Sequence, residues 1–153
     1  MSSYYYRDPK APSPTRLHIG TAIAIYRDGL LLLDHRRDGG WGLIGGALEL
    51  GESLEQCARR EAMEETGLDI GALSLLGVFS HPSRIIQYPD GDAVQSVTVC
   101  FAAEAVAGAI RISEESRDVR FVTRDELLRL PVVQTHQMIV PYLFKRGSWP
   151  VIQ

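Results

Sequence analysis

The sequence has few residues of the kinds that bind zinc or form disulfides. Only two of its 153 residues are cysteine, and Cys57 and Cys100 lie far apart and form no CxxC motif. The four histidines are also scattered along the chain. Zinc ligation is therefore not expected, and both cysteines are interpreted as reduced, buried, small hydrophobic residues.

Long apolar runs and an excess of positive charge are also missing. No segment approaches the ~18 uninterrupted apolar residues of a membrane helix, and the N-terminal MSSYYYRDPKAPSPT has no apolar run of signal-peptide length. The net charge is −3, so no global basic field would attract nucleic acid or an anionic membrane. We expect a cytoplasmic protein with neither nucleic acid nor membrane as a partner.

The composition is typical of one globular domain, with 45% apolar and 23% charged residues. Residues 1–15 are rich in proline and polar residues and are predicted to form an extended lead-in, followed by a single domain over residues 16–153. The lead-in carries Tyr4, Tyr5 and Tyr6. These rings could stack on a ligand, but packing on the domain surface or across a homodimer is the favoured interpretation.

The patterns along the chain predict a mixture of strands and helices. Bulky and small residues alternate over 17–26, which is typical of a strand with one crowded face. A short helix is predicted from Thr123 to before Pro131, and a further helix, interrupted by Pro141, over residues 132–147. Other strands are predicted at 29–37, 72–81, 93–106, 109–112 and 119–122, with a glycine-rich loop at 36–46 and a hairpin turn at 88–92.

The clearest prediction is a helix over residues 54–66. Ser53 is a good N-cap with Gln56 three residues later, and Gly67 suits the position after the helix. One face of this helix carries both apolar residues and carboxylates, in the order Leu54, Cys57, Ala58, Glu61, Glu65 and Leu68. Because the carboxylates continue the apolar stripe, solvation of an exposed helix face explains them poorly.

The acidic residues of this helix are placed where they destabilise it. Glu61 and Glu65 are four residues apart, and such like-charged pairs cost roughly 0.2 to 0.5 kcal/mol on an isolated helix. Both lie toward the C-terminal end, where the helix dipole disfavours anions. Arg60 can pair with Glu64, but nothing in the helix is expected to neutralise Glu61 or Glu65. A hard cation such as Mg²⁺ would reverse this balance, and we favour it over a solvated acidic face.

The segment from Gly46 to Leu68 resembles the Nudix box, G-x5-E-x7-R-E-U-x-E-E-x-G-U, where U is a bulky aliphatic residue. Every spacer has the correct length, and the fixed positions hold Gly46, Glu52, Arg60, Glu61, Ala62, Glu64, Glu65, Gly67 and Leu68. The chain therefore resembles a MutT-like Nudix hydrolase. It departs from the pattern at two places: Ala62 is smaller than the pattern prefers, and Ile44 stands where many members have proline.

The resemblance implies a fold, a cofactor and a set of site residues. The fold is α/β (α+β), a Nudix-type αβα sandwich around a mixed β-sheet. Glu52 and Arg60 look like the pair that orients the acidic residues of the site. The implied cofactor is Mg²⁺, with Mn²⁺ as a substitute, and its ligands would be Glu61, Glu64, Glu65 and the backbone carbonyl of Gly45.

Substrate contacts are predicted in the glycine-rich loop. Arg36 and Arg37 can present bidentate forks to phosphate, although an exposed basic strand end explains them equally well. Trp41 is a candidate for stacking on a base, with simple packing as the alternative. Gly46, the first residue of the box, is predicted to contact substrate.

The general base has more than one candidate. Glu61 could accept the proton, and the acidic loop SEESRD offers Glu114 and Glu115 ahead of a strand. We prefer Glu115 as an active-site participant. Ordinary solvation of an acidic loop is the competing explanation for Glu114 and Glu115.

Three functions remain open from the sequence. The favoured one is a Mg²⁺-dependent hydrolase of a nucleoside diphosphate derivative, such as ADP-ribose or a nucleotide sugar, in which water attacks phosphorus. The second is a (deoxy)nucleoside triphosphate pyrophosphohydrolase. The third is a non-catalytic nucleotide-binding regulator, against which the intact R-E-x-x-E-E pattern argues, since a pure binder needs no such pair of glutamates. A homodimer is an open alternative to a monomer.

Overall fold

Two long parallel strands form the centre of the β-sheet. The structure is a computed structural model that describes residues 1–153. Strands β2 (Arg16–Arg27) and β9 (Ala93–Ala107) pair in parallel over most of their length. Antiparallel strands flank them in the order β1-β8-β9-β2-β3-β10, so the sheet is mixed as predicted. The other elements are β1 (Ser3–Tyr6), β3 (Leu30–Arg36), β4 (Trp41–Gly42), β5 (Ile44–Ala47), α1 (Leu54–Thr66), β6 (Asp69–Ile70), β7 (Ser74–Phe79), β8 (Arg84–Gln87), β10 (Ser116–Val122), α2 (Arg124–Leu127), the 3₁₀ helices η1 (Gln134–His136), η2 (Val140–Tyr142) and η3 (Arg146–Ser148), and β11 (Val151–Ile152).

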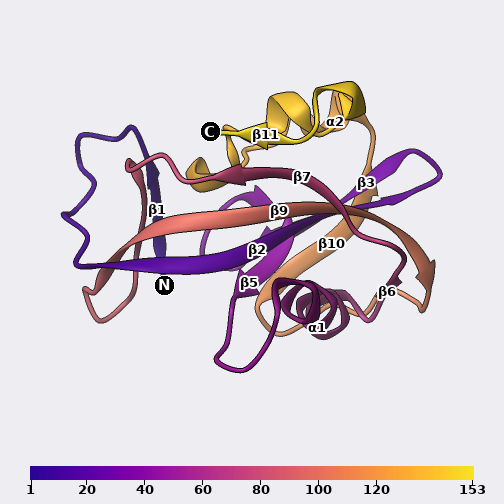
Figure 1. Cartoon of the computed structure of the whole chain (residues 1–153), viewed down its shortest axis with the longest axis horizontal. Coiled ribbons are helices and arrows are strands. Elements are labelled where there is room, and N and C mark those ends of the chain that lie inside the picture. Colours follow the sequence, from indigo (N-terminus) through magenta and orange to yellow (C-terminus); the bar gives the residue numbers. More distant parts are fainter.

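Both faces of the sheet are covered. Side chains alternate along a strand, so Ile23 and Ile25 of β2 are buried with α1, whereas Ala22, Ala24 and Tyr26 are buried with the C-terminal segment. Figure 1 shows α1 on one face and α2 with the C-terminal 3₁₀ helices on the other. The predicted αβα arrangement is confirmed in this form. The prediction of one crowded face is confirmed, since the isoleucines lie on the α1 side and the small alanines on the other, which the C-terminal segment also buries.

Helix α1 begins and ends where its caps predict. The Ser53 hydroxyl accepts a hydrogen bond from the backbone N–H of Gln56, and the Gln56 side chain accepts one from the backbone N–H of Ser53. At the other end Gly67 has φ 73°, and its N–H donates to the carbonyl of Met63. This left-handed conformation costs glycine little. The predicted helix over residues 54–66 is therefore confirmed.

The N-terminal segment differs from its prediction. Ser3–Tyr6 forms strand β1, which pairs antiparallel with β8, so part of the expected lead-in belongs to the sheet. Strand β8 was itself not predicted, because it is short and lies directly before the turn at 88–92. Together the two strands extend the sheet beyond β9.

Two further predictions are wrong. Residues 109–112 form no strand; the N–H of Arg111 donates instead to the carbonyl of Thr66 at the end of α1. The predicted helix over 132–147 is replaced by short 3₁₀ helices, one of which contains Pro141 near its start. Proline has no backbone N–H to continue an α-helix, which accounts for the break. No helix of the chain is sufficiently long and apolar to span a bilayer.

Candidate active site

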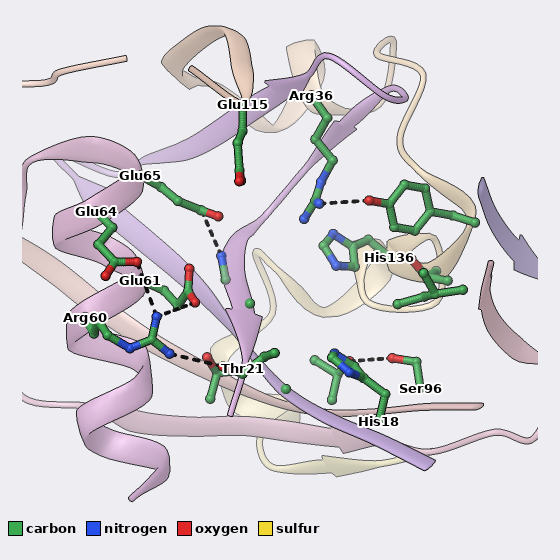
Figure 2. A pocket seen from close by; sticks show the side chains of 18 of the residues that line it. His18, Thr21, Arg36, Arg60, Glu61, Glu64, Glu65, Ser96, Glu115 and His136 are labelled. Carbon is green, nitrogen blue, oxygen red and sulfur yellow. Dashed lines mark hydrogen bonds and ion pairs between the residues drawn. The ribbon is translucent and has the colours of Figure 1, made fainter. Parts of the chain in front are cut away.

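A cleft of about 620 Å³ opens beside α1. Its walls come from α1, strands β1, β2, β3, β5, β8 and β9, the loop before β10, and η1. Only 4 of its 23 lining residues are hydrophobic, so it suits a polar ligand. Figure 2 shows the carboxylates of α1 at one end, and His18 and Ser96 at the other. An adjoining cavity of about 420 Å³ shares Tyr4, Arg36, Glu65 and Glu115 with the cleft.

Arg60 organises the acidic end of the cleft. Its Nε and Nη2 donate to the two carboxylate oxygens of Glu52, at 3.0 and 2.6 Å. Its Nη1 donates to Glu61 at 2.7 Å and to Glu64 at 3.3 Å. The prediction that nothing in the helix neutralises Glu61 is therefore wrong, because Arg60 contacts Glu61 as well as Glu64. The bidentate pair with Glu52 fixes the plane of the guanidinium and, through it, the position of the Glu61 carboxylate.

Glu65 has no such partner in the helix. Its Oε2 accepts a hydrogen bond from the backbone N–H of Gly45 at 3.1 Å. Burial raises the pKa of Glu65 to about 8, while Arg36 and the Gly45 N–H oppose that rise. Burial also raises the pKa of Glu61, against the effect of Arg60. Two partly buried carboxylates side by side are costly to ionise, and a cation placed beside them would remove that cost.

Two glycines allow β5 to pass close to α1. Gly45 has φ 157°, and a Cβ at this position would overlap the carbonyl oxygen of Thr21 on β2. A Cβ on Gly46 would overlap the carboxyl group of Glu61. Strand β5 pairs with β2 through these residues. The glycines of the loop are therefore needed for the close approach of backbone and carboxylate, rather than for flexibility.

Arg36 is the cation with hydrogen-bonding capacity to spare. Its one side-chain hydrogen bond runs from Nη1 to the hydroxyl of Tyr4, and it forms no ion pair. The buried side-chain atoms without any partner are Arg36 Nε and Asp34 Oδ1, both at this cleft or its adjoining cavity. In Figure 2 the side chains of Arg36, Glu65 and Glu115 point into the same space. This arrangement suits an anion carrying a bound cation.

The opposite end of the cleft is built around Arg84, which is 1% exposed. Its guanidinium donates only to neutral acceptors, and burial lowers its pKa to about 10. Arg84 was not predicted as a site residue, because no carboxylate near it in the sequence marks it as part of an ion pair. The acceptors are the carbonyls of Phe79, Ser96 and Thr135 and the hydroxyl of Thr98.

His136 is a second cleft residue that sequence reasoning missed. The backbone N–H of Leu43 donates to its Nδ1 at 3.1 Å, so Nδ1 is the unprotonated nitrogen. Burial lowers the pKa of His136 well below its ordinary value, helped by the charges of Arg36 and Arg84. The ring is therefore neutral and carries its proton on Nε2. A neutral imidazole can donate one hydrogen bond to a ligand in the cleft.

The sequence matches the family model described as NUDIX domain over residues 16–143. The chain belongs to the NUDIX family. It is a MutT-like pyrophosphohydrolase, and the acidic end of its cleft is the Nudix box.

Curated relatives include proteins of different activities. A MutT-like protein of Streptomyces ambofaciens is 34% identical over 129 residues, covering 83% of this chain and 77% of the relative. An ADP-ribose pyrophosphatase of Methanocaldococcus jannaschii is 32% identical over 123 residues, covering 75% and 69%. The chain is thus similar both to a protein described only as MutT-like and to one that acts on ADP-ribose.

Solved structures confirm the Nudix fold. The MutT protein of Bacillus halodurans has a TM-score of 0.70 and 27% identity, covering 84% of this chain and 83% of that one. The NUDIX domain of Shewanella oneidensis NrtR, in complex with ADP ribose, has a TM-score of 0.67 and 27% identity, covering 92% and 94%.

Nudix proteins typically depend on a divalent metal ion, and the donor set of this box fits one. The acidic side chains offer the oxygen ligands that Mg²⁺ prefers, and two of them, Glu61 and Glu65, are partly buried and have raised pKa values. No three acidic, histidine or cysteine side chains converge closely enough to hold an ion in this arrangement. Arg60 holds Glu61 and Glu64, while Gly45 holds Glu65. Each of these contacts uses one carboxylate oxygen, so ion binding requires the side chains to move closer together while the other oxygens face the ion.

The structure separates the other predicted site residues. Glu115 lines the cleft with Glu114, and Arg36 and Gly46 do so as well. Arg37 is exposed and lines only the adjoining cavity. Trp41 lines neither.

Trp41 is instead a core residue, so the prediction that it stacks on a base is wrong. It is 5% exposed and its ring stacks on His35, with the ring centroids 4.6 Å apart. The guanidinium of Arg120 covers it at 4.8 Å, and its backbone pairs with residues 131 and 133. A loop tryptophan looks accessible in the sequence, but here the C-terminal segment covers it.

Proposed function

We propose that this Nudix hydrolase cleaves the diphosphate linkage of a nucleoside diphosphate derivative of the ADP-ribose or nucleotide-sugar type, using Mg²⁺ and water attack at phosphorus. The observation that carries the proposal is that Arg36, a guanidinium without an ion pair, lines the same cleft as the partly buried carboxylates of Glu61 and Glu65. A diphosphate would bind to Arg36, and the cation that it carries would bind to the two carboxylates.

The acidic residues have distinct roles in this proposal. Glu61, Glu64 and Glu65 would hold the cation, together with the carbonyl of Gly45. Bound Mg²⁺ would neutralise charge on the phosphoryl oxygens and help to position the attacking water. Mn²⁺, which accepts similar oxygen ligands, would substitute.

Arg60 and Glu52 keep the acidic side chains in place. The two hydrogen bonds between them fix the guanidinium, which in turn contacts Glu61. Orientation of this kind matters because misplacement of a reacting group by ~1 Å can cost about 100-fold in rate. We therefore assign both residues to positioning rather than to contact with the reacting atoms.

The proton of the attacking water would go to a carboxylate at the cleft. Glu115 is our preferred acceptor, because it lies on the loop opposite α1 and its side chain points into the space that Arg36 and Glu65 share. Glu61 is the alternative, since burial raises the pKa of its carboxyl and makes it a better base. Arg36 would bind the phosphoryl oxygens as a planar fork.

The charge of the cleft favours a diphosphate ester over a triphosphate. Three arginines line the cleft, but Arg60 is occupied by carboxylates and Arg84 by neutral acceptors. Arg36 alone has free donors, and no lysine lines the cleft. A triphosphate chain carries more negative charge than one free arginine and a metal ion would offset. At the far end the donors of Arg84 are already taken by neutral acceptors, and Tyr88 with the hydroxyls of Ser96 and Thr98 offers polar groups that suit a sugar or nucleoside.

The relatives support this choice without excluding the second function. The Methanocaldococcus jannaschii relative is an ADP-ribose pyrophosphatase, and the Shewanella oneidensis domain holds ADP ribose. Other relatives, such as the nucleoside triphosphatase NudI of an Enterobacter strain at 33% identity over 93 residues, favour a (deoxy)nucleoside triphosphate pyrophosphohydrolase. This second function is therefore kept as the competitor in the test.

The test is product analysis with purified protein, Mg²⁺ and a panel of ADP-ribose, nucleotide sugars and nucleoside triphosphates. AMP and a phosphosugar are the expected products. Pyrophosphate and a nucleoside monophosphate as the dominant products would support the second function instead. Turnover should fall at least ~100-fold in Glu65→Gln. Glu55→Gln is the matched control, because Glu55 is exposed on the same helix and pairs only with Arg59.

A further inference from the structure

The three N-terminal tyrosines face different surroundings. Strand β1 pairs with β8, with Tyr4 opposite Ile86 and Tyr5 opposite Ile85. Because side chains alternate along a strand, Tyr4 and Tyr5 point to opposite faces of the sheet. Tyr4 lines the cleft, whereas the hydroxyl of Tyr5 donates to the side chain of Gln87 at 3.4 Å. The function proposed above gives none of the three a role.

Tyr4 connects the free arginine of the cleft to an aspartate. Arg36 Nη1 donates to the Tyr4 hydroxyl at 3.3 Å, the contact drawn at Arg36 in Figure 2. The same hydroxyl donates to Asp38 Oδ2 at 3.1 Å. The guanidinium carbon lies 5.5 Å from the centroid of the Tyr4 ring, a cation–π distance. Tyr4 thus contacts Arg36 through both its hydroxyl and its ring.

The acceptor that Tyr4 offers is neutral. Burial raises the pKa of the Tyr4 phenol, so the group stays protonated. The charges of Asp34, Asp38 and Glu65 all favour a higher pKa of Arg36, yet none of these carboxylates forms an ion pair with it. A direct pair with a carboxylate would occupy the guanidinium donors and cancel their charge. By standing between Arg36 and Asp38, the tyrosine holds the arginine in place and leaves its charge available.

We propose that Tyr4 is a positioning residue of the active site: its hydroxyl keeps Asp38 from pairing with Arg36, so that Arg36 can bind the phosphates of the substrate. The proposal rests on the role of Arg36 as a phosphate-binding residue in the function proposed above. It also assigns to β1 the task of completing the cleft wall.

The first test compares Tyr4→Phe with Tyr5→Phe. Both changes remove one hydroxyl from the same strand, and the phenyl ring at position 4 keeps the packing and the cation–π contact. Loss of one hydrogen bond to a charged group should raise KM for the substrate about tenfold in Tyr4→Phe, with kcat changed much less. Tyr5→Phe should match the wild type. Equal effects of the two changes, or a loss of thermal stability that accounts for the effect, would overturn the proposal.

The second test asks whether Asp38 captures Arg36 when the hydroxyl is absent. Asp38→Asn in the Tyr4→Phe background removes the competing charge, so KM should return toward the wild-type value. A purely structural role of Tyr4 predicts the opposite, since the double variant would lose two contacts. Failure of Asp38→Asn to lower KM would therefore reject this mechanism.

A binding measurement separates this proposal from the choice of substrate. Calorimetric titration with ADP needs no turnover, and Tyr4→Phe should weaken ADP binding about tenfold relative to Tyr5→Phe. If ADP-ribose is not cleaved but ADP binding still depends on Tyr4, the substrate proposal fails and the positioning role stands. If the wild type cleaves ADP-ribose while Tyr4→Phe binds ADP as well as Tyr5→Phe does, the positioning role fails alone. Absence of ADP binding by the wild type would refute Arg36 as the phosphate site and both proposals with it.

Discussion

Replacement of Glu65 by glutamine should make the metal-free protein more stable while it removes activity. Burial raises the pKa of Glu65 to about 8, against an ordinary value of 4.5. Each tenfold change in proton affinity corresponds to ~1.4 kcal/mol, so ionising Glu65 in the folded protein costs at most about 5 kcal/mol. Because the cleft is open to water and Arg36 relaxes, we expect about 2 kcal/mol or more of this cost to be measurable. Glutamine carries no charge and can still accept the hydrogen bond from Gly45.

The sign of the pH dependence follows from the two states. Between the unfolded pKa near 4.5 and the folded pKa near 8, the folded protein holds a proton on Glu65 that the unfolded chain has lost. The contribution of Glu65 to stability is therefore largest at low pH and is lost as the pH rises through about 8. Glu65→Gln should match the wild type near pH 4.5 and exceed it above pH 8.

The assay is urea unfolding in EDTA at a series of pH values, for the wild type, Glu65→Gln and Glu64→Gln. Glu64→Gln reports the loss of an exposed carboxylate on the same turn of α1, since its side chain is 60% exposed, and it is compared only without metal, because Glu64 is itself a proposed ligand. Added Mg²⁺ should stabilise the wild type and have little effect on Glu65→Gln, since only the charged carboxylate binds the ion. If Glu65→Gln is no more stable than the wild type at high pH without metal, the reasoning about its buried charge is refuted.

Three other predictions concern the backbone, the histidine and the tryptophan of this region. Gly46→Ala should leave the fold intact by circular dichroism but reduce kcat/KM at least ~100-fold, because the added methyl group displaces the Glu61 carboxylate; wild-type activity would contradict the close approach. His136 should stay neutral with its proton on Nε2 at pH values where ordinary histidines titrate, because Nδ1 accepts from Leu43; ¹⁵N spectra showing a proton on Nδ1 would contradict this. Trp41→Phe should lower the free energy of unfolding by about 1 to 2 kcal/mol without raising KM; a raised KM at unchanged stability would restore its predicted substrate contact.

Local signals account for what the sequence predicted well. The bounds of α1 follow from Ser53, Gln56 and Gly67, whose hydrogen bonds reach no further than one helical turn. The Nudix box is similarly contained within one loop and one helix, so its spacing is visible in the sequence. Strands β2, β3, β7, β9 and β10 were also found close to their true positions, because their apolar residues are continuous or alternate.

Long-range contacts account for what was missed. Trp41 is buried by residues near 132, which the glycine-rich loop gives no reason to expect. Arg84 looks like an ordinary surface residue until acceptors from three other segments surround it. The alternating residues 109–112 resemble a strand, but their backbone is engaged by the end of α1. Tyr4 joins the cleft only because β1 finds an edge at β8, a strand that was itself not predicted.

The hydrogen bonds of Arg84 have a consequence for how the cleft responds to ligands. Its donors reach the end of β7, β9 and η1 at once, so opening any one of these segments would leave a buried cation unsatisfied. Local opening at this end of the cleft should therefore be rare, and the backbone amide hydrogens of these segments should exchange slowly with solvent. The carboxylates at the other end must move closer together before they can hold an ion. The Nudix box is thus the adaptable side of the cleft. The side that Arg84 holds is rigid, and its shape selects the substrate.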